Sequence, residues 1–168
     1  GKTTTTSMIS QIMLDHNEDP TLSIGGILKS IQGNIRIGKS GYFVTEACEY
    51  TNSFLSFNPK IAVILNIEED HLDYYKDLDD IKCAFRDFAL LADRAVVINA
   101  DDKNTCDTVA TLSINKISFG YSESCTYYPA NIVYNRGAFA EFDVMSGGEK
   151  IAHLKLNIPG THNILNSL

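Results

Sequence analysis

Apolar residues follow two different periods along this chain, and the change between them falls near Gly120. Before it, short runs that are apolar throughout alternate with stretches in which apolar residues recur every three or four positions. The run 61–67 is of the first kind and the stretch 78–92 is of the second. Because fully apolar runs are typical of parallel strands covered by helices on both faces, 61–67 is predicted to be a central strand of a parallel sheet.

The same pattern predicts the other elements around this sheet. A helix is expected to begin at Lys2. Its apolar positions have helical spacing: Met8, Ile9, Ile12 and Met13. Residues 29–40 contain several turn formers and are expected to be an ordered excursion. The remaining predictions are strands at 21–24, 41–46, 95–98 and 116–119 and helical segments at 53–57 and 105–112.

Beyond Gly120, apolar and polar residues alternate one by one, which is typical of antiparallel strands with one buried face. Strands are predicted at 127–133, 138–144 and 151–158, with turn signals at 135–137 and 146–148. A further helix is expected to start at Asn163. The predicted fold class is therefore α/β, with a mostly parallel P-loop-type sheet flanked by helices and a small antiparallel β subregion near the C-terminus.

Composition narrows the class of protein. A chain of 168 residues, 44% of them apolar, can form one domain with a substantial core. A net charge of −7 argues against a polyanion-binding surface, so nucleic acid is not an expected partner. The four cysteines have neither zinc-site nor disulfide spacing, which favours reduced thiols and a cytoplasmic location. No apolar run reaches the roughly 18 residues of a membrane span, so no membrane partner is expected.

The first three residues, Gly1-Lys2-Thr3, have the composition of the second half of a phosphate-binding loop. Such a loop needs a flexible glycine, a lysine for the β- and γ-phosphates and a hydroxyl for Mg²⁺. Since a helix is predicted to begin here, its N–H groups and dipole would favour an anionic ligand. The tripeptide alone is common, however, and the threonines are also consistent with capping hydroxyls at a frayed terminus.

Polar side chains follow three of the predicted strands: Glu46, the segment 68–71, and Asp101-Asp102. Ligands bind beyond the carboxyl ends of parallel strands, and carboxylates with an imidazole facing a polyphosphate suit a Mg²⁺-nucleotide site. Each residue also has a simpler interpretation. Asp101 or Asp102 can cap the following helix, Glu46 can be a solvated loop charge, and His71 can be a surface histidine.

Two other conspicuous features are not expected to take part in chemistry. Cys48 has no histidine close in sequence and is expected to be a small buried side chain. The Tyr74-Tyr75 pair is expected to pack in the core or on the surface.

Five motifs carry a resemblance that none of them carries alone. They are Gly-Lys-Thr-Thr-Thr-Thr at 1–6, Glu-Ala-Cys-Glu-Tyr at 46–50, Asn-Ile-Glu-Glu-Asp-His-Leu-Asp-Tyr at 66–74, Asn-Ala-Asp-Asp at 99–102 and Pro-Gly-Thr-His-Asn-Ile-Leu-Asn at 159–166. In this order and spacing the chain resembles the Mur ligase family. The resemblance covers residues 1–168 and implies the central ATP-binding domain, with an N-terminal UDP-sugar domain and a C-terminal amino-acid domain outside it.

The resemblance implies a role for each matching residue at the phosphate end of the site. The residues implied to contact the ATP phosphates are Gly1, Lys2, Thr3 and Thr4. Thr3, Glu46 and His71 would hold Mg²⁺. Lys2, Glu46 and His71 would be the catalytic residues.

Further positions follow from the same resemblance. His162, Asn163 and Asn166 match the segment that lines the adenine and ribose site, and Asp70 would orient His71. Two departures stand out. Many relatives have Asp in place of Cys48, and no lysine stands near Phe85 or Arg86, where other branches carry a carbamylated lysine.

Within the family, the motifs are most similar to the branch that joins L-alanine to UDP-N-acetylmuramate. The implied reaction is an ATP-dependent carboxylate–amine ligation in peptidoglycan precursor synthesis, with an acyl phosphate intermediate and small-molecule substrates only. Two alternatives remain: a sibling ligase, for murein tripeptide recycling or a later amino acid addition, and a nucleotide-binding module that is inactive by itself.

Overall fold

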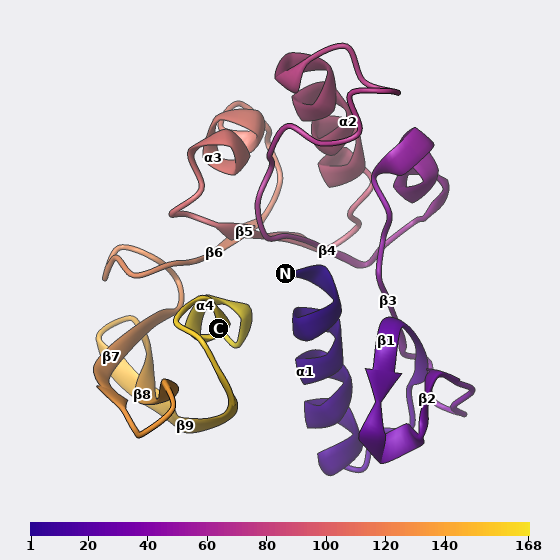
Figure 1. The fold of residues 1–168 in the computed structure, drawn as a ribbon. Helices are drawn as coiled ribbons and strands as arrows, with labels where there is room; N and C mark the ends of the chain where they lie inside the picture. The colour runs from indigo at the N-terminus through magenta and orange to yellow at the C-terminus, as the bar shows by residue number, and fades with distance from the viewer. The chain divides into compact units, whose positions relative to one another are not determined.

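The computed structural model describes residues 1–168 and has the alternating helices and strands that the sequence predicts (Figure 1). The chain divides into two compact units, Gly1–Ala47 and Cys48–Asn166. Its strands form three sheets of three strands each. None of its helices has the length and hydropathy of a membrane span.

The first unit pairs one helix with a mixed sheet of order β2-β1-β3. Its β1 is parallel to β3 and antiparallel to β2. The excursion expected at 29–40 is ordered, and it contains a strand, not predicted as such, that hydrogen-bonds back onto β1. Turn formers in the segment hid this strand from the sequence pattern. The elements of the unit are α1 (Lys2–Asp15), β1 (Thr21–Leu28), the 3₁₀ helix η1 (Lys29–Ile31), β2 (Gly33–Arg36) and β3 (Phe43–Thr45).

Helix α1 packs against the sheet through small polar side chains instead of the predicted apolar stripe. Its buried residues are Thr6 and Ser10, whereas Ile12 is 64% exposed. The Ser10 hydroxyl donates to the Thr6 carbonyl at 2.7 Å, so its burial leaves no polar atom unsatisfied. Small side chains let the helix lie close to β1, whose Leu22 and Ile24 are buried.

The second unit begins with a fully parallel sheet of order β4-β5-β6. Figure 1 shows α2 and α3 on the same face of this sheet. The strands and helices predicted at 78–92, 95–98, 105–112 and 116–119 are confirmed, with shifts of a few residues at their ends. The elements are η2 (Tyr50–Ser56), β4 (Ile61–Ile64), α2 (Leu78–Leu90), β5 (Ala95–Asn99), α3 (Lys103–Val109) and β6 (Lys116–Phe119).

Strand β4 is not the centrally placed, doubly covered strand that was predicted. It ends at Ile64 and lies at one end of its three-stranded sheet. Ala62 and Ile64 are buried, but Ile61 and Val63 on the other face are 53% and 37% exposed. An apolar run shows that both faces can be buried, and whether they are buried depends on the layers that surround the strand.

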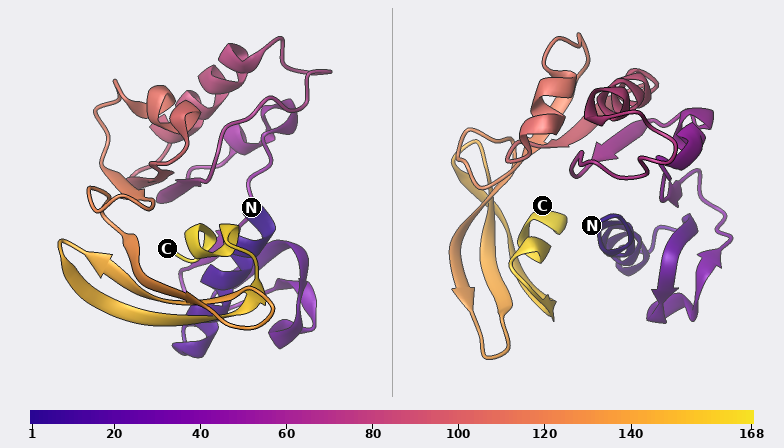
Figure 2. Two further views of the ribbon diagram at one scale, coloured as in Figure 1. Left: turned by 60° about the vertical axis from the view of Figure 1, so that its left-hand side comes forward. Right: turned by 45° about the horizontal axis from the view of Figure 1, so that its top comes forward.

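The last sheet is antiparallel, in the order β7-β8-β9, as predicted. Its strands are β7 (Tyr128–Tyr134), β8 (Phe139–Ser146) and β9 (Glu149–Pro159), followed by α4 (His162–Asn166). Both views in Figure 2 show the yellow C-terminal helix beside this sheet. Ile164 of α4 is fully buried with Phe142 of β8, and their apolar contact fixes the helix on the sheet.

A charged network crosses the strands β8 and β9. Both ring nitrogens of His153 contact carboxylates: Nδ1 lies 2.7 Å from Asp143 Oδ1, and Nε2 lies 3.1 Å from Glu141 Oε1. Lys150 Nζ lies 2.6 Å from the same Asp143 oxygen. The hydrogen bonds to Asp143 and Glu141 raise the pKa of His153. The bonds from Lys150, Asn131 and His153 hold the pKa of Asp143 well below its usual range.

We predict that this network makes stability depend on pH. Because the pKa of His153 is raised on folding, its contribution is fully present below the ordinary histidine value of 6.5 and is lost as the pH rises through the raised pKa. The difference in unfolding free energy between the wild type and His153→Gln, measured by urea denaturation from pH 5.5 to pH 9, should therefore shrink as the pH rises. In an Asp143→Asn background the same comparison should vary less with pH. A difference that is constant with pH in both backgrounds would refute the prediction.

Candidate functional site

The N-terminus of α1 presents the first set of predicted site residues. Gly1 is the N-cap residue, no side chain caps the helix, and no acidic residue lies in the first turn. The positive end of the helix dipole is therefore not offset by an acidic side chain of its first turn. Gly1, Lys2 and Thr3 are exposed and Thr4 is half-buried, an arrangement that suits the binding of an anion.

Glu46 makes one hydrogen bond to this helix end and another to β1. The residue directly follows β3, which is parallel to β1, so its carboxylate reaches both β1 and α1. Its Oε1 accepts from the Gly25 backbone N–H at 2.6 Å, and its Oε2 accepts from the Thr3 hydroxyl at 3.1 Å. Two of the three residues predicted to hold a metal, Thr3 and Glu46, are therefore direct neighbours.

Gly25 is required for this contact. A Cβ atom on Gly25 would lie only 2.7–2.9 Å from the carboxylate atoms of Glu46, which is closer than van der Waals contact allows. The glycine lets the carboxylate approach the backbone of β1, and no larger residue can take its place without moving Glu46. The prediction that strand 21–24 ends at the glycines is corrected accordingly, because β1 continues through them.

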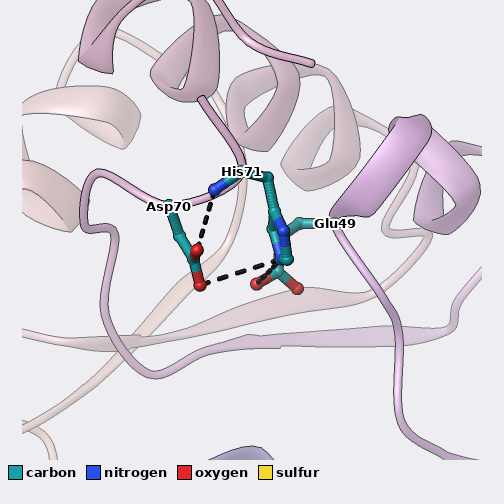
Figure 3. Close-up of side chains that lie close together, drawn as sticks. All are labelled: Glu49, Asp70 and His71. Carbon is teal, nitrogen blue, oxygen red and sulfur yellow. Dashed lines mark hydrogen bonds and ion pairs between the residues drawn. The ribbon is translucent and has the colours of Figure 1, made fainter. Parts of the chain in front are cut away.

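His71 lies in the second unit, in the loop between β4 and α2, with two carboxylates beside it (Figure 3). Its Nε2 is 3.7 Å from Asp70 Oδ2 and 3.9 Å from Glu49 Oε1. One ligand atom from each residue can be chosen so that all three lie within 4.8 Å of one another. Nitrogen and oxygen donors at this spacing can hold a divalent cation after small movements of the side chains.

Glu49 is the member of this group that the sequence reasoning missed. Its motif, 46–50, drew attention to Glu46, the other glutamate in the segment. Glu46 belongs to the first unit and Glu49 to the second. The joint role of Glu46 and His71 stays a prediction, whereas the proximity of Glu49 to His71 is a feature of the structure.

Asp70 orients the backbone of His71. Its Oδ1 accepts the His71 N–H at 2.7 Å, and His71 adopts a left-handed conformation with φ of 55°. This bond between adjacent residues supports a backbone conformation that costs free energy in residues other than glycine.

The Asp101-Asp102 pair serves the fold, as the simpler interpretation held. Asp102 Oδ1 accepts from the backbone N–H of Thr105 at 2.8 Å and from its hydroxyl at 2.6 Å, which caps α3. The same oxygen accepts from the Ile67 N–H at 3.2 Å. Asp101 Oδ2 accepts from the Tyr121 N–H at 2.9 Å.

Side chains from η2 interlock with the turn that follows His71. The Tyr75 hydroxyl, at 2.5 Å from the Glu49 carbonyl oxygen and 2.8 Å from Asn52 Oδ1, bonds to both. Asn52 Nδ2 donates to the Tyr74 hydroxyl at 3.2 Å. Tyr75 is 3% exposed and Tyr74 is 44% exposed, so the expectation that they pack in the core or on the surface is confirmed. Burial raises the pKa of Tyr75.

The segment at 162–166 forms α4, and its residues differ in exposure. His162 is exposed, whereas Asn163 is 5% exposed. Asn163 Nδ2 donates to the Pro159 carbonyl at 2.7 Å, and its Oδ1 accepts from Asn166 Nδ2 at 3.0 Å. Asn163 therefore shapes the turn into α4, which leaves His162 as the most accessible of the three predicted nucleotide contacts.

The structure shows the surroundings of the two positions at which this sequence departs from the family that it resembles. Cys48 is exposed, so the expectation of a buried side chain was wrong: it lies between β3 and η2, where the connecting chain runs at the surface. Phe85 packs edge-on against Phe54 at 5.2 Å between ring centroids. An aromatic core contact therefore occupies one of the two positions considered for the missing lysine.

Comparison with known proteins shows the family to which the chain belongs. The model of the Mur ligase middle domain matches residues 1–168. UDP-N-acetylmuramate--L-alanine ligase of Agathobacter rectalis is 49% identical over 170 residues, which cover all of this chain and 37% of that protein. The chain thus spans a little over a third of the length of such relatives.

Two solved structures share the fold. The UDP-N-acetylmuramate-alanine ligase MurC of Thermotoga maritima has a TM-score of 0.83 and 33% identity, over 99% of this chain and 37% of that one. The UDP-N-acetylmuramate:L-alanyl-gamma-D-glutamyl-meso-diaminopimelate ligase of Neisseria meningitides has a TM-score of 0.85 and 26% identity, over 99% and 55%. The chain belongs to the Mur ligase family and matches the middle domain of that family.

We predict that Tyr75→Phe destabilises the fold without changing its packing. The substitution removes the hydroxyl that bonds to Glu49 and Asn52 and leaves two partly buried acceptors without it, so the unfolding free energy should fall by about 1 kcal/mol. Urea denaturation measures the change. Tyr134→Phe, at a tyrosine that is 48% exposed, is the control and should stay within about 0.5 kcal/mol of the wild type. Equal stability of all three proteins would contradict a stabilising role for the hydrogen bonds of the Tyr75 hydroxyl.

Proposed function

We propose that this chain is the ATP-binding part of an ATP-dependent ligase that joins L-alanine to UDP-N-acetylmuramate. The observation that carries the proposal is the 49% identity, over the whole chain, to a relative of that name. It is supported by the contact between Thr3 and Glu46 at the N-terminus of α1 and by the cluster of Glu49, Asp70 and His71.

A sibling ligase is the second candidate. The UDP-N-acetylmuramate:L-alanyl-gamma-D-glutamyl-meso-diaminopimelate ligase of Neisseria meningitides shares the fold, with a TM-score of 0.85, but its identity is 26%. The alanine-adding relatives are more similar in sequence, which favours L-alanine as the amino acid. We propose that the recognition of amino acid and UDP-sugar belongs to parts of the protein outside these 168 residues.

At the phosphate end, the chain supplies positive charge and hydrogen-bond donors. Lys2 is proposed to bind the β- and γ-phosphate oxygens, with the N–H groups of the first turn of α1 and the hydroxyls of Thr3 and Thr4 beside it. His162, with Asn163 and Asn166 behind it, is proposed to line the adenine and ribose site.

The donor sets fit Mg²⁺, which prefers oxygen ligands and retains several waters. Thr3 and Glu46 offer a hydroxyl and a carboxylate 3.1 Å apart, and Glu49 and Asp70 add carboxylates beside His71. Thr3, Glu46 and His71 remain the proposed ligands, and within the second unit the carboxylate of Glu49 lies beside His71. When bound, Mg²⁺ would neutralise negative charge that develops on the transferred phosphoryl group.

The proposed reaction runs in two steps. A muramoyl carboxylate oxygen attacks the γ-phosphorus of ATP, and ADP leaves, which gives an acyl phosphate. The amino nitrogen of L-alanine then attacks the acyl carbon, inorganic phosphate leaves, and the nitrogen loses a proton. Lys2 would stabilise the phosphates in the first step, and His71 would orient the carboxylate, so that two anions can approach each other.

Ligation by the full-length protein tests the proposal, with ATP, Mg²⁺, UDP-N-acetylmuramate and L-alanine as reactants and phosphate release as the readout. Lys2→Ala should weaken ATP binding by about 10- to 100-fold, because a charge-assisted hydrogen bond contributes about 1.5–3 kcal/mol. His71→Ala should lower kcat with a smaller effect on ATP binding. Lys29→Ala, at another exposed lysine, is the control. Normal ligation by both site variants would rule out these roles, and preference for another amino acid would favour a sibling ligase.

We further predict that Gly25→Ala impairs Mg²⁺-dependent binding of a fluorescent ATP analogue while the unfolding free energy changes little. The new Cβ would displace the Glu46 carboxylate from Thr3, and only the flexible end of one side chain has to move. Gly41→Ala is the matched control, because a Cβ there meets nothing within 4 Å. Unchanged metal-dependent binding in Gly25→Ala would show that the Thr3–Glu46 contact is dispensable.

A further inference from the structure

We propose that Tyr50 and Asp73 are positioning residues that hold the imidazole of His71 in its working orientation. The inference rests on the proposed function, in which His71 acts on the reacting groups. It concerns side chains of the second unit only.

The imidazole needs a restraint that its own segment does not supply. His71 lies in a loop, has a left-handed backbone, and its side chain is 32% exposed. The neighbouring carboxylates of Asp70 and Glu49 lie at 3.7 and 3.9 Å from Nε2, and both distances are longer than a hydrogen bond. Neither carboxylate therefore fixes the direction of the ring.

The ring of Tyr50 supplies this restraint. Its centroid is 4.7 Å from the centroid of the His71 ring, and the two planes are tilted by 40°. At this distance the rings are in van der Waals contact, and rotation of the imidazole about its side-chain bonds would collide with Tyr50 or break the contact.

Tyr50 is itself held at its far end. Its hydroxyl donates to Asp73 Oδ2 at 2.9 Å, and Asp73 lies two residues after His71. The Tyr74 ring meets the Tyr50 ring edge-on at 6.1 Å. Tyr50 thus connects η2 to the His71 loop at two points. Its aromatic ring contacts His71, and its hydroxyl bonds to Asp73.

Such a bridge affects the chemical step more than substrate binding. Catalytic groups have to be held within about 0.5 Å of the productive geometry, and an error of about 1 Å can cost about 100-fold in rate. Loss of the Tyr50 ring should therefore lower kcat of the full-length protein by about 10- to 100-fold and leave KM for ATP within about threefold. Tyr50→Phe keeps the ring but loses the hydrogen bond to Asp73, as Asp73→Ala does, so both variants should have an intermediate effect on kcat.

The test combines kinetics with a readout that needs no activity. Full-length protein labelled with ¹³C at the histidine rings gives one NMR signal for His71, assigned by its loss in His71→Gln. We expect this signal to move in Tyr50→Ala, to move less in Tyr50→Phe, and to stay in place in Tyr134→Ala, a control at a similarly exposed tyrosine. Tyr50→Leu replaces Tyr50→Ala if the alanine variant does not unfold cooperatively.

The outcomes separate the two proposals. A shifted His71 signal with reduced kcat and unchanged KM in Tyr50→Ala, and smaller changes of the same kind in Tyr50→Phe and Asp73→Ala, supports the positioning role. An unmoved signal, or wild-type kcat despite a moved signal, overturns it. If the wild type does not ligate, the proposed function fails, and the positioning role in that reaction fails with it; a moved signal would then show only that the ring contact exists.

Discussion

One carboxylate oxygen, Asp102 Oδ1, connects the parts of the second unit on which the site depends. It accepts from Thr105 at the start of α3 and from the Ile67 N–H just beyond β4. Asn104 Nδ2 donates to the Ile67 carbonyl at 2.8 Å, so both backbone groups of Ile67 are held. The side chain of Ile67 is fully buried. The loop that carries His71 therefore leaves the sheet from a fixed point, even though it has no regular structure of its own.

Acidic residues after strands have two different uses in this molecule. Asp102 binds backbone and hydroxyl donors of α3, whereas Glu46 binds one backbone N–H and the hydroxyl of Thr3. Glu46 contacts Thr3 at the N-terminus of α1, and the first turn of this helix contains no acidic residue. Both are acidic residues that follow a parallel strand. Only Asp102 lies directly before a helix, at the position of an N-cap, and the sequence alone shows this difference.

The limits of the sequence pattern follow from what it measures. Periodicity reports which side chains are able to be buried, so it predicted α2, β5 and the three strands of the last sheet. It does not report which layers cover a strand, so it misjudged β4, and it does not report small polar packing, so it missed Thr6 and Ser10. Turn formers concealed β2 in the same way. Motif resemblance gave His71, but the contacts of Glu49 and Tyr50 with it arise from the close approach of η2 to a distant loop, which no local pattern encodes.

Charge imposes a further condition on the His71 loop. Residues 66–77 contain five carboxylates, at 68, 69, 70, 73 and 77, and one lysine, Lys76. Glu49 adds another carboxylate beside the imidazole. A polyphosphate or a substrate carboxylate that approaches this loop meets like charge, which a single lysine cannot balance. A cation from solution can balance it, and ligand atoms from Glu49, Asp70 and His71 already lie within 4.8 Å of one another. The negative charge of the loop therefore supports the proposal that the reaction uses a divalent metal, which phosphoryl transfer also favours.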